Sequence, residues 1–151
     1  MKARVMQMAW GIAKNAESRF GGKATQYITE AMKMAWSLIK ELDSYNASWY
    51  QKKLRLAVTV TNNGYSLEIR NSYYVKEEFK ALGYRFDGLS AWYIKKNSLA
   101  EICEEVVSLY ELHICTRAEE AGGLYDSGLL IAGENDFTDA QCDRVNVALG
   151  R

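Results

Sequence analysis

Two runs of alternating residues on either side of an Asn-Gly pair constrain this chain most strongly. Apolar and polar residues alternate over 54–61 and again over 65–69, and Asn63-Gly64 stands between the two runs. Asn-Gly is the strongest short signal for a two-residue hairpin turn. With that turn Val60 lies opposite Leu67, so the apolar residues of both strands share one face. The sequence therefore predicts an antiparallel hairpin with one buried face.

Helical periodicity dominates the N-terminal third. Apolar residues recur at intervals of three and four over 1–20 and again over 28–42, and Gly21-Gly22 separates the two stripes. Each stripe is typical of an amphipathic helix. Two helices joined by a tight glycine turn form an antiparallel hairpin, which we predict for residues 1–44.

The central stretch predicts a helix followed by two strands. Apolar residues at helical spacing over 75–82 end at Gly83, where a left-handed C-cap residue belongs. Residues 84–87 and 91–96 alternate as strands do. Together with the first hairpin, these segments supply a small and mostly antiparallel sheet.

Capping boxes mark two helices in the C-terminal part. Ser98 with Glu101 and Thr138 with Gln141 have the spacing that satisfies the first backbone N–H groups of a helix. Between these helices the pattern predicts a short strand over 112–116 and a buried strand over 129–132. The fold class is therefore α+β: an N-terminal helical hairpin (1–44), then a small, mostly antiparallel sheet with helices on one face (52–151).

Composition favours a packed, cytoplasmic protein without a cofactor. The chain has 48% hydrophobic residues, which suffices for a core, and no apolar run approaches the length of a membrane span. The N-terminus reads as amphipathic, and we expect no secretory signal. Cys103, Cys115 and Cys142 are far apart and form no C-x-x-C pair, so we expect reduced thiols.

No reaction signature occurs in the sequence. P-loop, dinucleotide-binding, zinc-protease and nucleophile-elbow motifs are all missing. On a strand over 112–116, His113 and Cys115 would share a face, but the chain has a single His and no third ligand in pattern. We therefore expect no catalytic residue, no metal site and no enzymatic activity.

The formal net charge of zero hides an uneven distribution. Residues 1–97 carry 16 Lys and Arg against 8 Asp and Glu, whereas residues 98–151 carry 3 against 11. Such asymmetry indicates an electrostatic partner, or two parts that neutralise each other within the fold.

Basic and aromatic residues gather in the central part of the chain, and they predict a nucleic-acid or partner-binding face. Phosphate binding needs clustered cations, and single-stranded nucleic acid also stacks on exposed aromatic rings. The alternative is that the aromatics form the core and the cations only maintain solubility. The predicted basic face consists of Lys52, Lys53, Arg55, Arg70, Lys76, Lys80, Arg85, Tyr93, Lys95 and Lys96.

Acidic residues follow this region and predict a second partner-binding face, which would mimic phosphates and occupy the nucleic-acid channel of a nuclease. The alternative is a solvated helix surface, which is common for runs of this kind. The predicted acidic face consists of Glu101, Glu104, Glu105, Glu111, Glu119 and Glu120.

Two segments resemble proteins of phages and mobile elements. Val75-Lys76-Glu77, Phe79 to Gly83, Arg85-Phe86-Asp87 and Ala91 to Ile94 resemble a small module of phage and plasmid proteins, with the pattern V-K-[DE]-x-L-K-x-L-G-x-R-W-D followed by W-Y. Phe86 stands where that module usually has Trp. Residues 20–36 resemble a helical segment common at the start of small phage and mobile-element proteins of Gram-positive bacteria. Both resemblances imply a mobile-element context.

From the charge pattern and these resemblances we expect a non-enzymatic phage or mobile-element protein that acts in the bacterial cytoplasm. Its most specific form is an anti-CRISPR inhibitor that binds a CRISPR effector ribonucleoprotein. The alternative is an accessory module for replication or plasmid transfer that binds DNA or RNA directly. A homodimer through the N-terminal helices is a further expectation.

Overall fold

The computed structural model describes residues 2–46, 53–117, 120 and 123–151. It confirms the predicted α+β class, because helices combine with strands that pair antiparallel throughout the described residues. The chain divides into two compact units: unit 1 is 1–51 with 74–84, and unit 2 is 52–73 with 85–151. The predicted domains 1–44 and 52–151 stay a prediction; the compact units differ from them by grouping 74–84 with the N-terminal helices.

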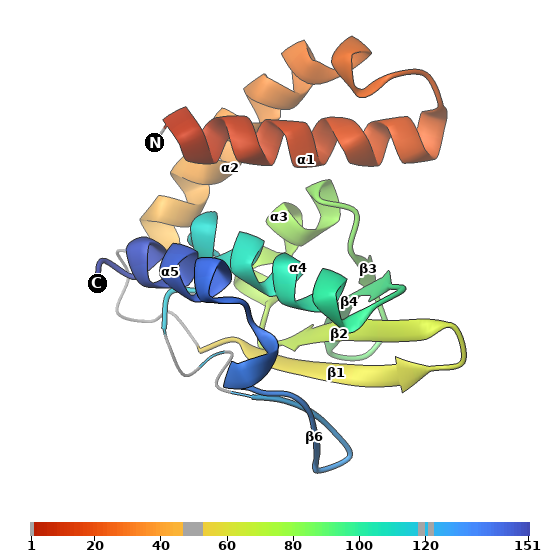
Figure 1. Cartoon of the computed structure of the whole chain (residues 1–151). Coiled ribbons are helices and arrows are strands. Elements are labelled where there is room, and N and C mark those ends of the chain that lie inside the picture. Colours follow the sequence, from red (N-terminus) through yellow and green to blue (C-terminus); the bar gives the residue numbers. More distant parts are fainter. Residues whose placement is uncertain (1, 47–52, 118–119, 121–122) are drawn as a thin grey trace. The chain divides into compact units, whose positions relative to one another are not determined.

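Unit 1 contains the predicted helical hairpin. Helix α1 (Lys2–Phe20) and helix α2 (Ile28–Asn46) pack against each other (Figure 1). Gly21 and Gly22 both have positive φ, 81° and 79°, so they take a conformation that other residues rarely adopt. The short 3₁₀ turn η1 (Ala24–Gln26) then leads into α2.

The third helix of unit 1 is α3 (Lys76–Ala81), which the 3₁₀ turn η2 (Tyr73–Val75) precedes. Phe79 is fully buried, and its ring centroid lies 4.8 Å from that of Tyr84. The Asn15 side-chain amide of α1 donates a hydrogen bond to the Ala81 carbonyl at 3.2 Å. The Asn15 hydrogen bond attaches α3 to the helical hairpin, although 29 residues of chain separate α2 from α3.

Unit 2 is built on a four-stranded antiparallel sheet in the order β1-β2-β4-β3. Strands β1 (Arg55–Thr61) and β2 (Gly64–Arg70) form the predicted hairpin, and β4 (Ala91–Lys96) pairs with β2. Strand β3 (Arg85–Phe86) is shorter than the predicted 84–87.

The hairpin register differs from the predicted one by two residues. Val60 pairs with Tyr65 and Val58 pairs with Leu67, so the turn residues are Asn62 and Asn63. Gly64 is a strand residue with φ +148°, and a Cβ there would collide with the carbonyl oxygen of Lys96. The glycine is therefore required for close approach to the end of β4. A shift of two residues keeps every side chain on its predicted face.

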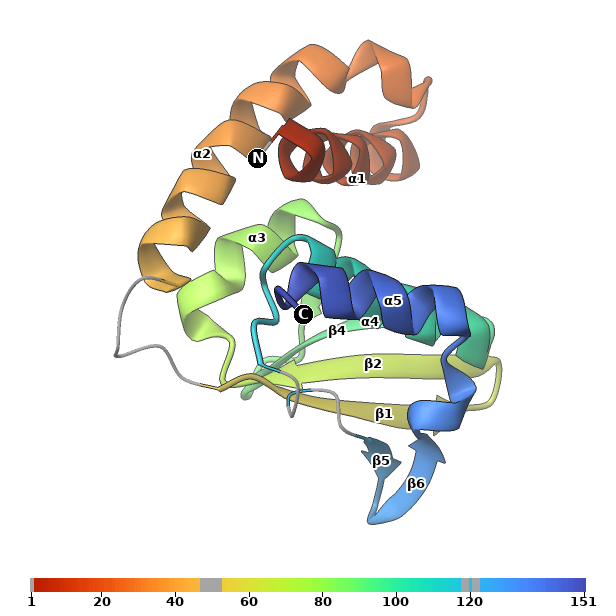
Figure 2. The same ribbon diagram turned by 60° about the vertical axis from the view of Figure 1, so that its left-hand side comes forward.

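Helix α4 (Leu99–Glu111) lies on one face of the sheet, and α5 (Asp139–Ala148) packs against α4 (Figures 1 and 2). Both predicted N-caps are present: Ser98 Oγ accepts from the Glu101 N–H, and Thr138 Oγ1 accepts from the Gln141 N–H. The α4 side of the sheet holds fully buried residues such as Leu67 and Ile69.

A small second hairpin follows α4. Strand β5 (Leu124–Asp126) pairs with β6 (Leu129–Ala132), and the 3₁₀ turn η4 (Glu134–Asp136) comes next. The Asp126 carboxylate accepts a hydrogen bond from the Val60 N–H at 3.1 Å, which places β5 along β1. The predicted buried strand over 129–132 was right as a strand but wrong in burial, because Leu129 is 69% exposed.

The predicted strand over 112–116 was wrong. The backbone N–H groups of Ile114 and Cys115 both donate to the Leu109 carbonyl, and His113 has φ +62°. This segment is therefore the C-terminal cap of α4, where a left-handed residue ends the helix. Across the residues that the structure describes, no helix has the length and apolar content needed to cross a membrane.

Candidate nucleic-acid interface

The sheet register assigns the side chains of unit 2 to two faces, because directly paired residues of an antiparallel sheet lie on the same face. Ile69 pairs with Trp92, so both lie on one face, and this face also bears Ile94 and Lys96, which are two and four positions after Trp92 in β4. The Lys96 ammonium lies 3.6 Å from the Glu105 carboxylate of α4, so α4 covers this face. The opposite face carries Arg55, Ala57, Thr59, Ser66, Glu68, Arg70, Arg85, Ala91, Tyr93 and Lys95. We call these ten residues the open sheet face.

Four cations lie on the open sheet face and all four are exposed: Arg55, Arg70, Arg85 and Lys95. Arg55 and Arg70 are direct cross-strand partners, and like charges in that position repel each other. Among the described residues, no carboxylate forms an ion pair with any of the four. Their guanidinium and ammonium groups are thus available to an external anion.

Tyr93 occupies the middle of the same face. It pairs with Glu68 on one side and with Arg85 on the other, and all three side chains are at least partly exposed. Small residues of the same face, including Ser66 and Ala91, are almost fully buried between longer side chains. A partly exposed ring beside cations matches the chemistry that stacks a base and holds its phosphate.

The turn before β4 adds an acidic group at one edge of this face. The Asp87 Oδ1 atom accepts hydrogen bonds from the N–H groups of Leu89, Ser90 and Ala91, at 2.8, 2.9 and 3.1 Å. These backbone hydrogen bonds, chiefly those from Leu89 and Ala91, lower the pKa of Asp87, and the charge of Arg70 lowers it further. Asp87 is therefore ionised at neutral pH and fixes the turn that starts β4.

The other members of the predicted basic face lie elsewhere. Lys96 is on the covered face beside Glu105, and Lys76 and Lys80 belong to α3 of unit 1. Lys53 is exposed directly before β1. Lys52 lies outside the described residues. The structure thus brings together five of the predicted residues, namely Arg55, Arg70, Arg85, Tyr93 and Lys95.

Most of the predicted acidic face makes contacts within unit 2. Arg144 of α5 donates to the Glu104 carboxylate at 2.8 Å and to the Glu111 carboxylate at 2.6 Å, which ties α5 to α4. These hydrogen bonds, with the one to Glu111 contributing most, raise the pKa of Arg144. A hydrogen bond from Gln141, followed by that from Arg144, lowers the pKa of Glu104.

The remaining acidic residues are dispersed. Glu101 accepts from the Asn97 N–H at 2.9 Å, and Glu105 pairs with Lys96 on the sheet side of α4. Glu120 is buried beside Cys115, and burial raises the pKa of both groups. Glu119 lies outside the described residues. The five glutamates that the structure describes are therefore not presented together as one exposed surface, and the role of the set in partner binding stays a prediction.

The thiols and the single histidine form no ligand cluster. Cys115 is buried and His113 caps α4, so the strand face that would have joined them does not exist. Burial, with a contribution from the Asp136 charge, raises the pKa of Cys103 to about 11. No group of three or more potential metal ligands occurs within the described part of the chain.

Sequence reasoning missed the interactions that connect distant segments. Arg144 is the clearest case, because it pairs with Glu104 across 40 positions and carries no motif. Asp126, which caps the edge of β1, and the pairing of Glu68 with Tyr93 were likewise not predicted. The Thr138 capping box was a usable signal, since it places Arg144 within the helix that Thr138 starts.

Residues 5–71 match the family described as Streptococcus thermophilus bacteriophage Gp111 protein. The matched segment includes most of α1, all of α2 and the β1–β2 hairpin, and it stops before the 75–94 segment that resembles a phage and plasmid module. No curated protein and no solved structure matches the chain. The family match supports the predicted phage context.

Proposed function

We propose that this chain is a non-enzymatic phage protein that binds the phosphate backbone of a nucleic acid through the open sheet face of unit 2. The observation that carries the proposal is the set of four exposed cations without an ion pair, arranged around Tyr93 on one face. Neutral overall charge does not oppose this, because phosphate binding depends on the local cluster.

The geometry favours an extended backbone over a single phosphate. Arg55 and Arg70 stand on adjacent strands at one end of the face, and Lys95 stands toward the other end of β4. Neighbouring strands are about 4.8 Å apart and alternate residues of one strand about 6.6 Å apart, so the cations span several phosphates. Four contacts predict a logarithmic salt slope of about −3.

In a phage context, the protein would inhibit a host nucleic-acid-processing complex. The most specific form of this proposal is an anti-CRISPR protein. The open sheet face would hold guide RNA or target DNA of a CRISPR effector ribonucleoprotein in the bacterial cytoplasm. The similarity of residues 5–71 to a phage family supports the setting. The contacts that Glu104, Glu105 and Glu111 already make favour the basic face over acidic mimicry.

The alternative is an accessory module that binds bare DNA or RNA during phage replication or plasmid transfer. The partly exposed Tyr93 ring favours this function for single strands, because stacking needs unpaired bases. The two functions use the same face and differ in whether the nucleic acid is bound free or inside a host complex.

A mobility-shift experiment separates them. Single- and double-stranded DNA and RNA are tested with the protein alone, and then with a CRISPR effector ribonucleoprotein and its target DNA. The face variant changes Arg55, Arg70, Arg85 and Lys95 to Ala. The matched control changes the exposed Lys2, Lys14, Lys33 and Lys40 of unit 1 to Ala, and so removes the same charge.

A shift of bare nucleic acid that only the face variant abolishes supports the accessory module. No shift alone, but loss of the effector's own target shift, supports the inhibitor. If neither effect occurs, or if both variants behave alike, the proposed nucleic-acid face is wrong.

A further inference from the structure

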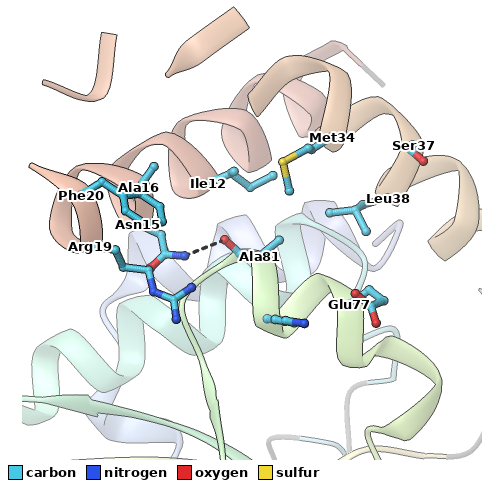
Figure 3. Close-up of a pocket in the computed structure, with 11 residues that line it drawn as sticks. Ile12, Asn15, Ala16, Arg19, Phe20, Met34, Ser37, Leu38, Glu77 and Ala81 are labelled. Carbon is cyan, nitrogen blue, oxygen red and sulfur yellow. Dashed lines mark hydrogen bonds between the residues drawn. The ribbon is translucent and has the colours of Figure 1, made fainter. Parts of the chain in front are cut away.

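Unit 1 contains a pocket of about 510 Å³ lined by residues of α1, α2 and α3 (Figure 3). Its walls are mostly apolar and include Ile12, Ala16, Met34 and Leu38. A volume between about 300 and 1,000 Å³ with mainly apolar walls and few polar groups is typical of small-molecule sites. This pocket is separate from the open sheet face, since every lining residue belongs to unit 1.

Part of the pocket wall is fixed by a hydrogen bond. Asn15 lines the pocket, and its amide donates to the Ala81 carbonyl at 3.2 Å, as the dashed line in Figure 3 shows. Gly83 follows α3 with φ +92°, and a Cβ there would lie 2.8 Å from Asn15 Oδ1. The wall between α1 and α3 is therefore formed without a ligand.

The charges at the pocket are unevenly placed. Arg19 lies at one end beside Phe20, whereas Glu77 lies toward the opposite end, near Leu38 (Figure 3). Lys80 also lines the pocket but stands on α3 one helical turn after Glu77, so Arg19 is the cation at the end away from the carboxylate. Within the described residues, neither Arg19 nor Lys80 forms an ion pair.

The mouth of the pocket exposes large apolar side chains. Phe20 is 75% exposed and Met34 is 47% exposed. Water contact of this kind is unfavourable for the side chain, and it is relieved when an apolar ligand covers the surface. Apolar walls, unpaired cations and an exposed apolar rim together describe a ligand with an apolar body and an anionic end.

We propose that this pocket binds a small amphiphilic acid, with the carboxylate at Arg19 and the apolar body along Ile12, Met34 and Leu38. Glu77 repels an anion from the far end and so sets the orientation. This site is independent of the nucleic-acid face, and neither proposal depends on the other.

Calorimetric titration of the full chain with octanoate, 1-octanol and octylammonium tests the proposal. Octanoate is expected to bind with one-to-one stoichiometry and at least tenfold more tightly than octylammonium. Hexanoate is expected to bind more weakly than octanoate by about fourfold for each missing methylene. Backbone amide shifts over 12–20 and 34–38 should accompany binding.

Two variants locate the site. Arg19→Glu should reverse the preference from octanoate to octylammonium, whereas Lys14→Glu, which is exposed and outside the lining, should not. Ala16→Phe should fill the pocket and abolish binding, with the far-ultraviolet circular dichroism checked for folding. No octanoate binding, equal affinity for the three ligands, unsaturable uptake, or binding unchanged in the charge-reversed variant would overturn the proposal.

Discussion

Glu78 of α3 makes the stability of this protein dependent on pH. Its side chain is fully buried, and neither carboxylate oxygen accepts a hydrogen bond from the described residues. Burial, together with the nearby charges of Glu41 and Glu77, raises the pKa of Glu78 from 4.5 to about 7. A buried carboxylate without a partner remains protonated in the folded state, because desolvation disfavours its charged form.

The sign and size of the effect follow from linkage. Between pH 4.5 and pH 7 the unfolded chain has released this proton while the folded chain keeps it, so the free energy of unfolding falls as pH rises. A difference of about 2.5 pKa units, at 1.36 kcal/mol each, corresponds to about 3 kcal/mol. The contribution of Glu78 to the free energy of unfolding is constant below pH 4.5 and is lost above pH 7.

Glu78→Gln removes the ionisation and should flatten this dependence. Urea unfolding is followed by far-ultraviolet circular dichroism at pH 4.5, 5.5, 6.5, 7.5 and 8.5 for the wild type and for the variant. The free energy of unfolding of the variant, minus that of the wild type, should rise by about 3 kcal/mol between the lowest and the highest pH. Glu77→Gln is the matched control, since Glu77 is the exposed neighbour on the same helix.

The difference between the Glu78→Gln and wild-type unfolding free energies must change with pH. A constant difference across the whole range would refute the buried, protonated carboxylate. An equal change in the Glu77→Gln control would mean that the loss of any negative charge on this helix causes the effect, and not the loss of Glu78 in particular.

Three further predictions concern unit 2. Arg144→Met should lower the free energy of unfolding by about 1 kcal/mol in urea titrations, because half-exposed pairs are screened by solvent; an unchanged midpoint would mean that the α4–α5 ion pairs contribute nothing. Cys142 should react with a thiol reagent at pH 8 in the native protein, whereas the buried Cys115 should react only in denaturant; equal rates would contradict its burial. Gly64→Ala should cost more than about 1 kcal/mol in thermal unfolding, since φ +148° and the Lys96 carbonyl both exclude a Cβ, and a neutral effect would contradict this register.

The sequence was sufficient to predict elements whose signals are local. Helical stripes and a glycine pair placed α1 and α2, and capping residues placed the starts of α4 and α5. The alternation of residues in the β1–β2 hairpin predicted which side chains share a face, and this held even though the turn lies one residue earlier and the cross-strand pairing shifts by two residues. A shift of two residues in the pairing leaves each side chain on the same face of the sheet. The exact pairing, in contrast, depends on the close contact of Gly64 with β4.

Properties that depend on distant contacts were not predictable. Residues 112–116 alternate like a strand, but backbone hydrogen bonds to Leu109 make them a helix cap. The acidic stripe of α4 reads as a solvated surface until Arg144, far along the chain, is placed beside it. The basic set was predicted as one face, yet alternation within β4 separates Lys95 from Lys96, and the lysines of α3 belong to the other unit.

The salt dependence of nucleic-acid binding tests the central claim most directly. Fluorescence anisotropy of a labelled single-stranded oligonucleotide is measured from low to physiological salt with the wild type, the face variant and the matched lysine variant. Engagement of the open sheet face predicts a logarithmic salt slope of about −3 that the face variant loses and the lysine variant keeps. An identical slope in all three proteins would contradict the assignment of the nucleic-acid interface to this face.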